Sequence, residues 1–151
     1  MALTFFVAEL KCAYCNTVSK ADTSTNMSNH LLSAPGVSVI RVGDKPDVKI
    51  GDFESAFLTL RLPTSNEPIR VLDWWTCPTC GKKNWAEIIF DHGEVKSIQA
   101  VKLSRASLDR ANFVSEDIYE DFEDMVGKSM WENNKLRPNF KELLKEHLPF
   151  E

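Results

Sequence analysis

The sequence lacks any apolar stretch that approaches the roughly 20 residues a membrane-spanning helix needs. It has no glycine-rich phosphate-binding loop, no nucleophile motif and no basic run of the kind that nucleic-acid binders present. The opening segment MALTFFVAEL has no basic lead-in and no small-residue cleavage site, so it is typical of a first strand and not of a signal peptide. These absences favour a cytoplasmic protein that does not associate with membranes and is not an enzyme.

The charge of the chain is acidic and unevenly distributed. Net charge is -4, with 11 basic and 11 acidic residues in 1–103 but 7 basic and 11 acidic residues in 104–151. An acidic balance favours a basic protein partner, or simply solubility. Apolar residues make up 43% of the chain, which is enough for a packed core without a disulfide framework. The four cysteines therefore need another explanation.

Hydrophobic patterning predicts an α+β fold with strands first and helices last. The predicted strands cover residues 3–10, 37–42, 56–62, 69–76, 85–90 and 95–103. Residues 21–30 are polar and predict an exposed loop. We expect an antiparallel β core over residues 1–103, with an insertion at about 16–70, and a helical element over 104–151 that packs on it.

Two helices are predicted in the last third, and a helical turn over 107–112 is a weaker third element. The first begins after Ser115 as the N-cap, follows the apolar spacing to Val126 and ends at Gly127. The second begins near Asn139, with Glu142 spaced to complete a capping box, and stops at Pro149.

The cysteines form two pairs, Cys12 with Cys15 and Cys77 with Cys80, each with two intervening residues. This spacing lets two thiolates of one tight turn bind the same tetrahedral zinc ion. The residues after the pairs, Asn16 and Gly81, are of the two types that adopt positive φ most readily, and such knuckles need positive φ there. The pattern predicts two metal-binding turns with the same chemistry.

Two such turns, each entered by an apolar strand, resemble the paired knuckles of the zinc-ribbon superfamily. The resemblance covers residues 3–20 and 69–103 and implies a small antiparallel sheet with the four cysteines as ligands of one structural Zn²⁺ ion. It says little about substrate or partner. The chain departs from the compact pattern because 61 residues separate Cys15 from Cys77, so an inserted β segment must lie between the knuckles.

Other readings of the cysteines remain open. Cys77-Pro78-Thr79-Cys80 looks like a glutaredoxin motif, although a redox pair of that kind begins a helix and here a strand is expected to follow. Iron on the same thiolates is another alternative. Four thiolates close the coordination shell, which argues against a catalytic metal. The histidines are predicted to be surface residues and not ligands: His30, His92 and His147.

Two surface features are candidates for binding. Residues 116–124 carry six acids and no base, which indicates either a solvated helix face or a docking face for a basic protein. The acids are Glu116, Asp117, Glu120, Asp121, Glu123 and Asp124. Trp74 and Trp75 are adjacent on a strand and must point to opposite faces, so one can fill the core and the other needs a cover, which the insertion or the helical element could supply. Otherwise an exposed tryptophan is a candidate interface anchor, and we name Trp75 and Trp131 for that role.

Three functional hypotheses follow. The first is a non-enzymatic, zinc-stabilised module that binds a protein partner, such as an inhibitor or immunity-type protein that occludes a toxin or enzyme domain. The second is a nucleic-acid-associated zinc ribbon that uses Lys82 and Lys83 at the tip of the second knuckle. A CxxC redox protein is a distant third.

Overall fold

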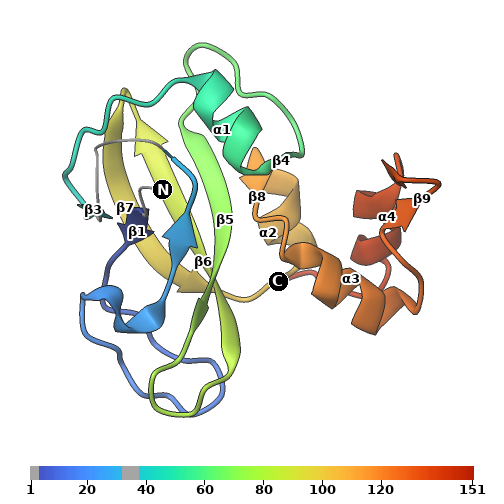
Figure 1. The fold of residues 1–151 in the computed structure, drawn as a ribbon, viewed down its shortest axis with the longest axis horizontal. Helices are drawn as coiled ribbons and strands as arrows, with labels where there is room; N and C mark the ends of the chain where they lie inside the picture. The colour runs from blue at the N-terminus through green and yellow to red at the C-terminus, as the bar shows by residue number, and fades with distance from the viewer. Residues whose placement is uncertain (1–3, 32–37) are drawn as a thin grey trace.

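The computed structural model describes residues 4–31 and 38–151 and has an α+β fold. A central sheet separates the N-terminal segment on one side from the C-terminal helices on the other (Figure 1). Leu3 and Val37, which the sequence places in the first two strands, lie outside the described residues. Within the described part of the chain, no helix is both long enough and apolar enough to cross a membrane.

The main sheet is built on an antiparallel meander of three long strands. These are β5 (Ile69–Thr76), β6 (Lys83–Asp91) and β7 (Glu94–Val101), as predicted to within two residues at each end. The turn between β6 and β7 has positive φ at His92 (52°) and Gly93 (80°), which matches the twist of a two-residue hairpin. The full strand order is β4-β8-β5-β6-β7, with β8 (Phe113–Val114) parallel to β5.

The predicted strand over 56–62 is largely wrong. Within this range only the two residues of β4 (Leu58–Thr59) form a strand. They follow a helix, α1 (Ile50–Ala56). The Asp52 side chain accepts a hydrogen bond from the Lys49 amide at the start of α1, and Phe53 on this helix is fully buried. Burial of Phe53 and this hydrogen bond therefore favour a helix just before the short strand, where the sequence predicts none.

The N-terminal segment forms a second, smaller sheet. Its strand β1 (Thr4–Phe6) pairs antiparallel with β2 (Ser28–Asn29) and parallel with β3 (Ser38–Ile40). The segment 21–30, predicted as an exposed loop, contains β2 and the short 3₁₀ turn η1 (Thr23–Thr25). That prediction is wrong in part, because three of its residues are buried: Thr25, Met27 and Asn29.

The two faces of the main sheet bury two separate apolar clusters. The first core includes Val71 and Trp75 of β5 and is covered by the N-terminal segment and α1. The second core includes Leu72 of β5 and Trp85 of β6 and is covered by the C-terminal helices. Because side chains alternate along a strand, neighbouring residues of β5 belong to different cores.

The two main C-terminal helices are shorter than the sequence predicts, and the predicted turn over 107–112 is a helix of that length that begins two residues earlier. Helix α2 spans Arg105–Arg110, α3 spans Ile118–Val126, and α4 spans Phe140–Lys145. Gly127 ends α3 in the left-handed conformation, as predicted, but the N-cap of α3 is Asp117 and not Ser115. Asn139 is the N-cap of α4, yet its side chain makes no capping hydrogen bond, so the predicted capping box is wrong. A small hairpin of β9 (Trp131–Glu132) and β10 (Lys135–Leu136) lies between α3 and α4.

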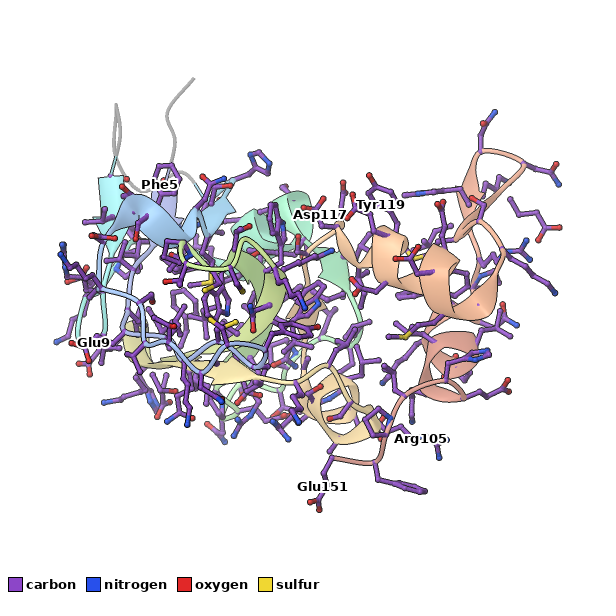
Figure 2. The ribbon with its side chains drawn as sticks, turned by 90° about the horizontal axis from the view of Figure 1, so that it is seen from below. Phe5, Glu9, Arg105, Asp117, Tyr119 and Glu151 are labelled. Atoms are coloured by element: carbon purple, nitrogen blue, oxygen red, sulfur yellow. The ribbon has the colours of Figure 1, made fainter. Side chains whose placement is uncertain are left out.

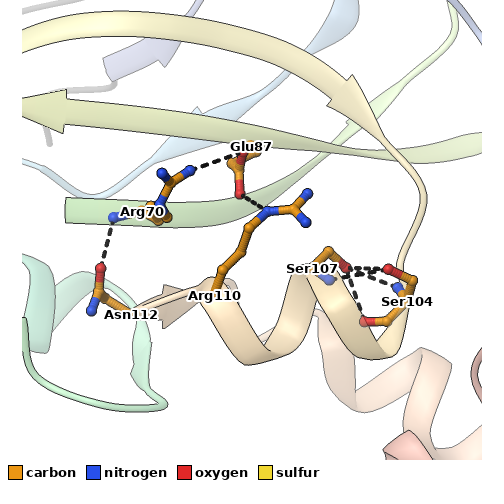
Figure 3. A network of polar contacts seen from close by, with 6 residues as sticks. All are labelled: Arg70, Glu87, Ser104, Ser107, Arg110 and Asn112. Carbon is orange, nitrogen blue, oxygen red and sulfur yellow. Dashed lines mark hydrogen bonds and ion pairs between the residues drawn. The ribbon is translucent and has the colours of Figure 1, made fainter. Parts of the chain in front are cut away.

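A buried carboxylate joins the sheet to α2 (Figure 3). Glu87 on β6 accepts a 2.7 Å hydrogen bond from Arg110 Nε and lies 3.6 Å from Arg70 Nη1 on the neighbouring strand. Asn112 accepts a 2.8 Å hydrogen bond from the Arg70 amide. Because Glu87 lies on the second-core face of the sheet, these contacts fix the position of α2 beside the apolar packing.

Candidate metal centre

Two tight turns, one at each end of the long insertion, carry the cysteine pairs. In the first knuckle the Cys12 amide donates to Thr17 O (3.0 Å) and the Asn16 amide donates to Cys12 O (3.1 Å). In the second, the Cys77 amide donates to Lys82 O (3.0 Å) and the Gly81 amide donates to Cys77 O (2.8 Å). The two turns thus repeat the same hydrogen-bond pattern at equivalent positions.

The residue after each pair has the backbone conformation that the sequence predicts. The φ angle is 61° at Asn16 and 74° at Gly81. Amides within the turns point at sulfur, since Tyr14 N lies 3.4 Å from Cys12 Sγ and Cys80 N lies 3.5 Å from Cys77 Sγ. The prediction of two equivalent knuckles is confirmed.

The four sulfur atoms converge at one point. Cys12 Sγ lies 3.6 Å from Cys80 Sγ, and Cys15 Sγ lies 3.6 Å from Cys77 Sγ. All four sulfurs lie within 4.8 Å of one another. A tetrahedral zinc ion with zinc–sulfur bonds of about 2.3 Å requires sulfur–sulfur distances of about 3.8 Å, whereas a disulfide requires about 2.05 Å. The geometry fits four ligands around one metal ion, and the cysteines are free.

Asn84, at the start of β6, connects the two knuckles. Its Oδ1 accepts a 3.0 Å hydrogen bond from the Ala13 amide, while its Nδ2 donates to Cys12 Sγ (3.4 Å) and to Lys82 O (3.1 Å). The side chain is 6% exposed. It therefore orients a cysteine ligand in the manner of the outer-shell groups of metal sites. Nothing in the sequence distinguishes this asparagine, because its role depends on the meeting of distant segments.

The pKa values of two cysteines move in opposite directions. Burial raises the pKa of Cys12, but hydrogen bonds from the Cys15 and Tyr14 amides and from Asn84 outweigh burial and lower it to about 6. The backbone near Lys82 lowers the pKa of Cys80, but burial and the adjacent thiols outweigh that contact and raise it to about 11. Four thiols this close oppose each other's ionisation, whereas a divalent cation at their centre favours four thiolates.

The positions of the cysteine pairs also bear on the hypothesis that one of them is a redox dithiol. Cys77 and Cys80 lie in the turn between β5 and β6, and Cys12 and Cys15 lie in a turn closed by a bridge between Lys11 and Val18. Neither pair therefore begins a helix, so no helix dipole lowers the pKa of a first thiol. The structure offers four convergent sulfurs instead of one redox dithiol.

Residues 116–124 lie in and just before α3, which presents Ile118 and Phe122 to the second core. Asp117 and Tyr119 are at its start (Figure 2). The exposed acids of the segment are Glu116, Glu120, Glu123 and Asp124. Lys83 of β6 contacts the helix, because its Nζ lies 3.1 Å from Asp121 Oδ2 and 3.6 Å from Glu120 Oε2.

Lys82 and Lys83, the predicted basic tip, face different surroundings. Lys83 Nζ also donates to Asp117 O (3.0 Å) and lies 5.2 Å from the centre of the Trp85 ring. Lys82 is exposed and lies 4.8 Å above the ring of Tyr14. One of the two lysines is therefore committed to an internal ion pair and is not free for phosphate.

The tryptophan assignment needs correction. Trp75 is 0% exposed and belongs to the first core, with its Nε1 donating to Trp85 O (3.1 Å), so it cannot serve as a surface anchor. Trp74, on the opposite face, is only partly buried against the second core. Trp131 is 43% exposed and remains a candidate anchor. The alternation along β5 was predictable, but which face carried the deeper core was not.

The three histidines are exposed and lie away from the cysteines. Among the described residues, the four cysteines are the group whose ligand atoms converge closely enough to hold a metal ion. Comparison of the chain with models of known protein families, with curated proteins and with solved structures gave no match.

Proposed function

We propose that the four cysteines hold a structural zinc ion and that the protein is a non-enzymatic module that binds a basic protein through the acidic surface of α3. The observation that carries the metal assignment is the convergence of four sulfurs at tetrahedral distances. Four thiolates leave no open position for water, so the metal's role is to join the two knuckles and not to catalyse.

Zinc is favoured over iron by the context of the site. Both metals accept four thiolates in a tetrahedron, but the assignment to zinc agrees with the resemblance of the knuckles to zinc ribbons. Elemental analysis of freshly purified, reduced protein tests this directly. We expect one zinc per chain, and a visible thiolate-to-iron absorption with stoichiometric iron would overturn the assignment.

The acidic surface is defined by the exposed carboxylates of α3: Glu120, Glu123 and Asp124. Among the described residues, the ion pairs of this helix are those of Lys83 with Glu120 and Asp121. Like charges on one helix face repel at a modest cost. A basic partner relieves this repulsion and accelerates association, and the exposed ring of Trp131 supplies apolar contact area in the same C-terminal part of the chain.

The concrete form of this proposal is an inhibitor or immunity-type protein that occludes a toxin or enzyme domain. The chain is small and acidic, with its excess negative charge in the C-terminal third. These properties suit a protein that masks a basic active-site surface by electrostatic attraction.

The test compares two triple variants with the same change in charge. In the first, Glu120, Glu123 and Asp124 become Lys; in the control, the exposed residues Glu9, Glu54 and Glu151 become Lys. Each protein is immobilised and exposed to a lysate of the source organism, and retained proteins are quantified by mass spectrometry. We expect the wild type and the control to retain a basic protein. The amount retained by the α3 variant should be lower by about tenfold or more. Equal retention by both variants would overturn the assignment of the surface.

A further inference from the structure

Asp73 lies on the face of β5 that packs against the first core, beside apolar side chains. Its neighbours on the same face, Val71 and Trp75, are 0% exposed, and Asp73 itself is 1% exposed. One carboxylate oxygen, Oδ1, accepts a 2.9 Å hydrogen bond from the Trp74 amide. The other, Oδ2, is buried and has no partner among the described residues. Buried polar atoms are normally satisfied, so this exception calls for a binding role.

Asn29 of β2 presents a second unsatisfied atom to the same place. Its side chain is 3% exposed, and its Oδ1 accepts a 2.9 Å hydrogen bond from the Leu31 amide. That bond fixes which end of the amide is oxygen, so Nδ2 is the group left over. Within residues 4–31 and 38–151, nothing accepts a hydrogen bond from this Nδ2.

Both side chains line a pocket of about 150 Å³, here named the Asp73 pocket. Its wall includes the aromatic side chains Phe57 and Trp74, and its rim includes Asp117 at the start of α3. The volume exceeds the ~30 Å³ share of a single water molecule. The Asp73 pocket therefore has room for the end of a side chain and opens beside the acidic surface.

The charges around the pocket favour a cation. Burial raises the pKa of Asp73 well above its usual value, and the charge of Asp117 adds to this effect. Burial likewise raises the pKa of Asp117, and the charge of Lys83 opposes part of that rise. A bound cation lets both carboxylates ionise. A metal ion does not fit, because the carboxylates and His30 that line the pocket do not converge as the cysteines do within the described structure.

We propose that the Asp73 pocket receives the guanidinium group of an arginine side chain from the protein partner. This inference rests on the proposed function, because it names the residue type with which that basic partner enters. A guanidinium is planar, stacks on aromatic rings such as that of Phe57 in the first core, and pairs with carboxylates such as Asp73 and Asp117. It is also more weakly hydrated than an ammonium group, so burial costs it less. A water molecule beside it accepts the hydrogen bond of Asn29 Nδ2.

The test uses the metal-loaded protein, labelled with ¹⁵N, and three small probes. These are the N-acetyl amides of arginine, of lysine and of citrulline, the last being an uncharged analogue of arginine. We expect the side-chain amide signal of Asn29 and the indole signal of Trp74 to shift with the arginine probe. Half-saturation should come at about a tenfold lower concentration of arginine probe than of citrulline probe, since charge-assisted pairs are the stronger ones.

Variants locate the effect in the pocket. Asp73→Asn keeps the shape of the side chain and the acceptor for the Trp74 amide, and it should weaken binding of the arginine probe about tenfold. If Asp73→Asn fails to fold, Asp117→Asn provides a second test. Asp47→Asn, at an exposed aspartate outside both the pocket and the acidic surface, is the control and should change nothing. Equal binding of arginine and citrulline, no shift with any probe, or an unchanged titration in folded Asp73→Asn would each overturn the inference.

Two outcomes separate this inference from the proposed function. If the α3 triple variant no longer binds a basic partner but the pocket does not bind the arginine probe, the docking surface is supported and the arginine assignment fails. If the pocket binds the arginine probe but the protein retains no basic partner, the proposed function fails, and the pocket is a site for a small guanidinium ligand and not for a partner's side chain.

Discussion

The two faces of the main sheet are covered in different ways. The first core lies under a segment in which β1 and β3 have three residues each and most of the described residues between them are loop. The second core lies under α2, α3 and α4, which bury large side chains such as Phe122, Phe140 and Leu144. Within the described residues, one face is thus covered mainly by irregular chain together with α1. The other face is covered by three amphipathic helices.

The proposed metal site explains this difference. Cys12 and Cys77 are themselves members of the first core, and their side chains join the N-terminal segment to the β5–β6 turn. A cross-link between such distant positions removes much of the entropy that the unfolded chain would otherwise have. The first core can therefore be covered by irregular chain, while the second depends on packed apolar area and on the ion pairs of Glu87 with Arg70 and Arg110.

The largest expected effect comes from removing one metal ligand. Cys77→Ser should release the metal and unfold the first core, because structural zinc sites contribute about 10–16 kcal/mol in small zinc domains, as much as the whole stability of a typical domain. Metal content by elemental analysis and thermal unfolding by circular dichroism measure the two effects.

The matched control for this change is Thr79→Ser, in the same turn and exposed. It should keep full metal occupancy and the wild-type melting temperature. If Cys77→Ser also kept both, the two pairs would not share a structural ion, and the contrast between the two cores would have no metal basis.

A large but smaller effect is expected from the second core. Phe122 is 0% exposed on the inner face of α3, and Phe122→Ala should lower the free energy of unfolding by about 3–5 kcal/mol through lost burial and a cavity. The metal should stay bound in the native state, because Cys12 and Cys77 pack in the first core whereas Phe122 packs in the second. Denaturant unfolding and elemental analysis of the same sample check both expectations.

Met125→Ala on the same helix is the control, since Met125 is 41% exposed and its truncation should change stability by no more than about 0.5 kcal/mol. Loss of metal in folded Phe122→Ala would show that the two cores are coupled and that the comparison between them is too simple.

The knuckles could be predicted from the sequence because their chemistry is local. The CxxC spacing, together with Asn16 and Gly81 at positions of positive φ, specifies each turn within a few residues. The three long strands followed from apolar patterning bounded by turn residues for the same reason. That the four cysteines meet is confirmed, whereas the identity of the metal stays a prediction.

What could not be predicted depends on contacts between distant segments. Trp75 was assigned to the surface because alternation along a strand does not say which face will be covered more deeply. The sequence places Lys83 in a basic tip, but in the fold its ammonium group pairs with Asp121 of α3. Nothing in the sequence distinguishes Asn84 or Asp73. Only the fold shows that Asn84 joins the two knuckles and that Asp73 lines a pocket and has a buried oxygen without a partner among the described residues.

A moderate effect is expected when the ligands are kept but their support is removed. Asn84→Ala deletes the hydrogen bond to Cys12 Sγ and the acceptor for the Ala13 amide. Loss of such outer-shell contacts typically weakens metal binding about 10–100-fold, so we expect a shift of that size in competition with a chromophoric chelator. The melting temperature of the metal-loaded protein should fall much less than in Cys77→Ser. An unchanged affinity would mean that the knuckles hold the metal without this bridge.

The smallest effect is expected from the backbone of the second knuckle. Gly81 has φ of 74°, and an added Cβ would meet no atom within 4 Å, so the cost of Gly81→Ala is conformational alone, about 1–2 kcal/mol for a left-handed non-glycine residue. Gly81→Asn should cost less than Gly81→Ala, because asparagine visits this region more readily and already occupies the equivalent position at Asn16, where φ is 61°. Denaturant unfolding of both variants in the metal-loaded form provides the measurement. If alanine were tolerated as well as asparagine, backbone conformation would not be what selects the residue after each cysteine pair, and the equivalence of the two knuckles would rest on sulfur geometry alone.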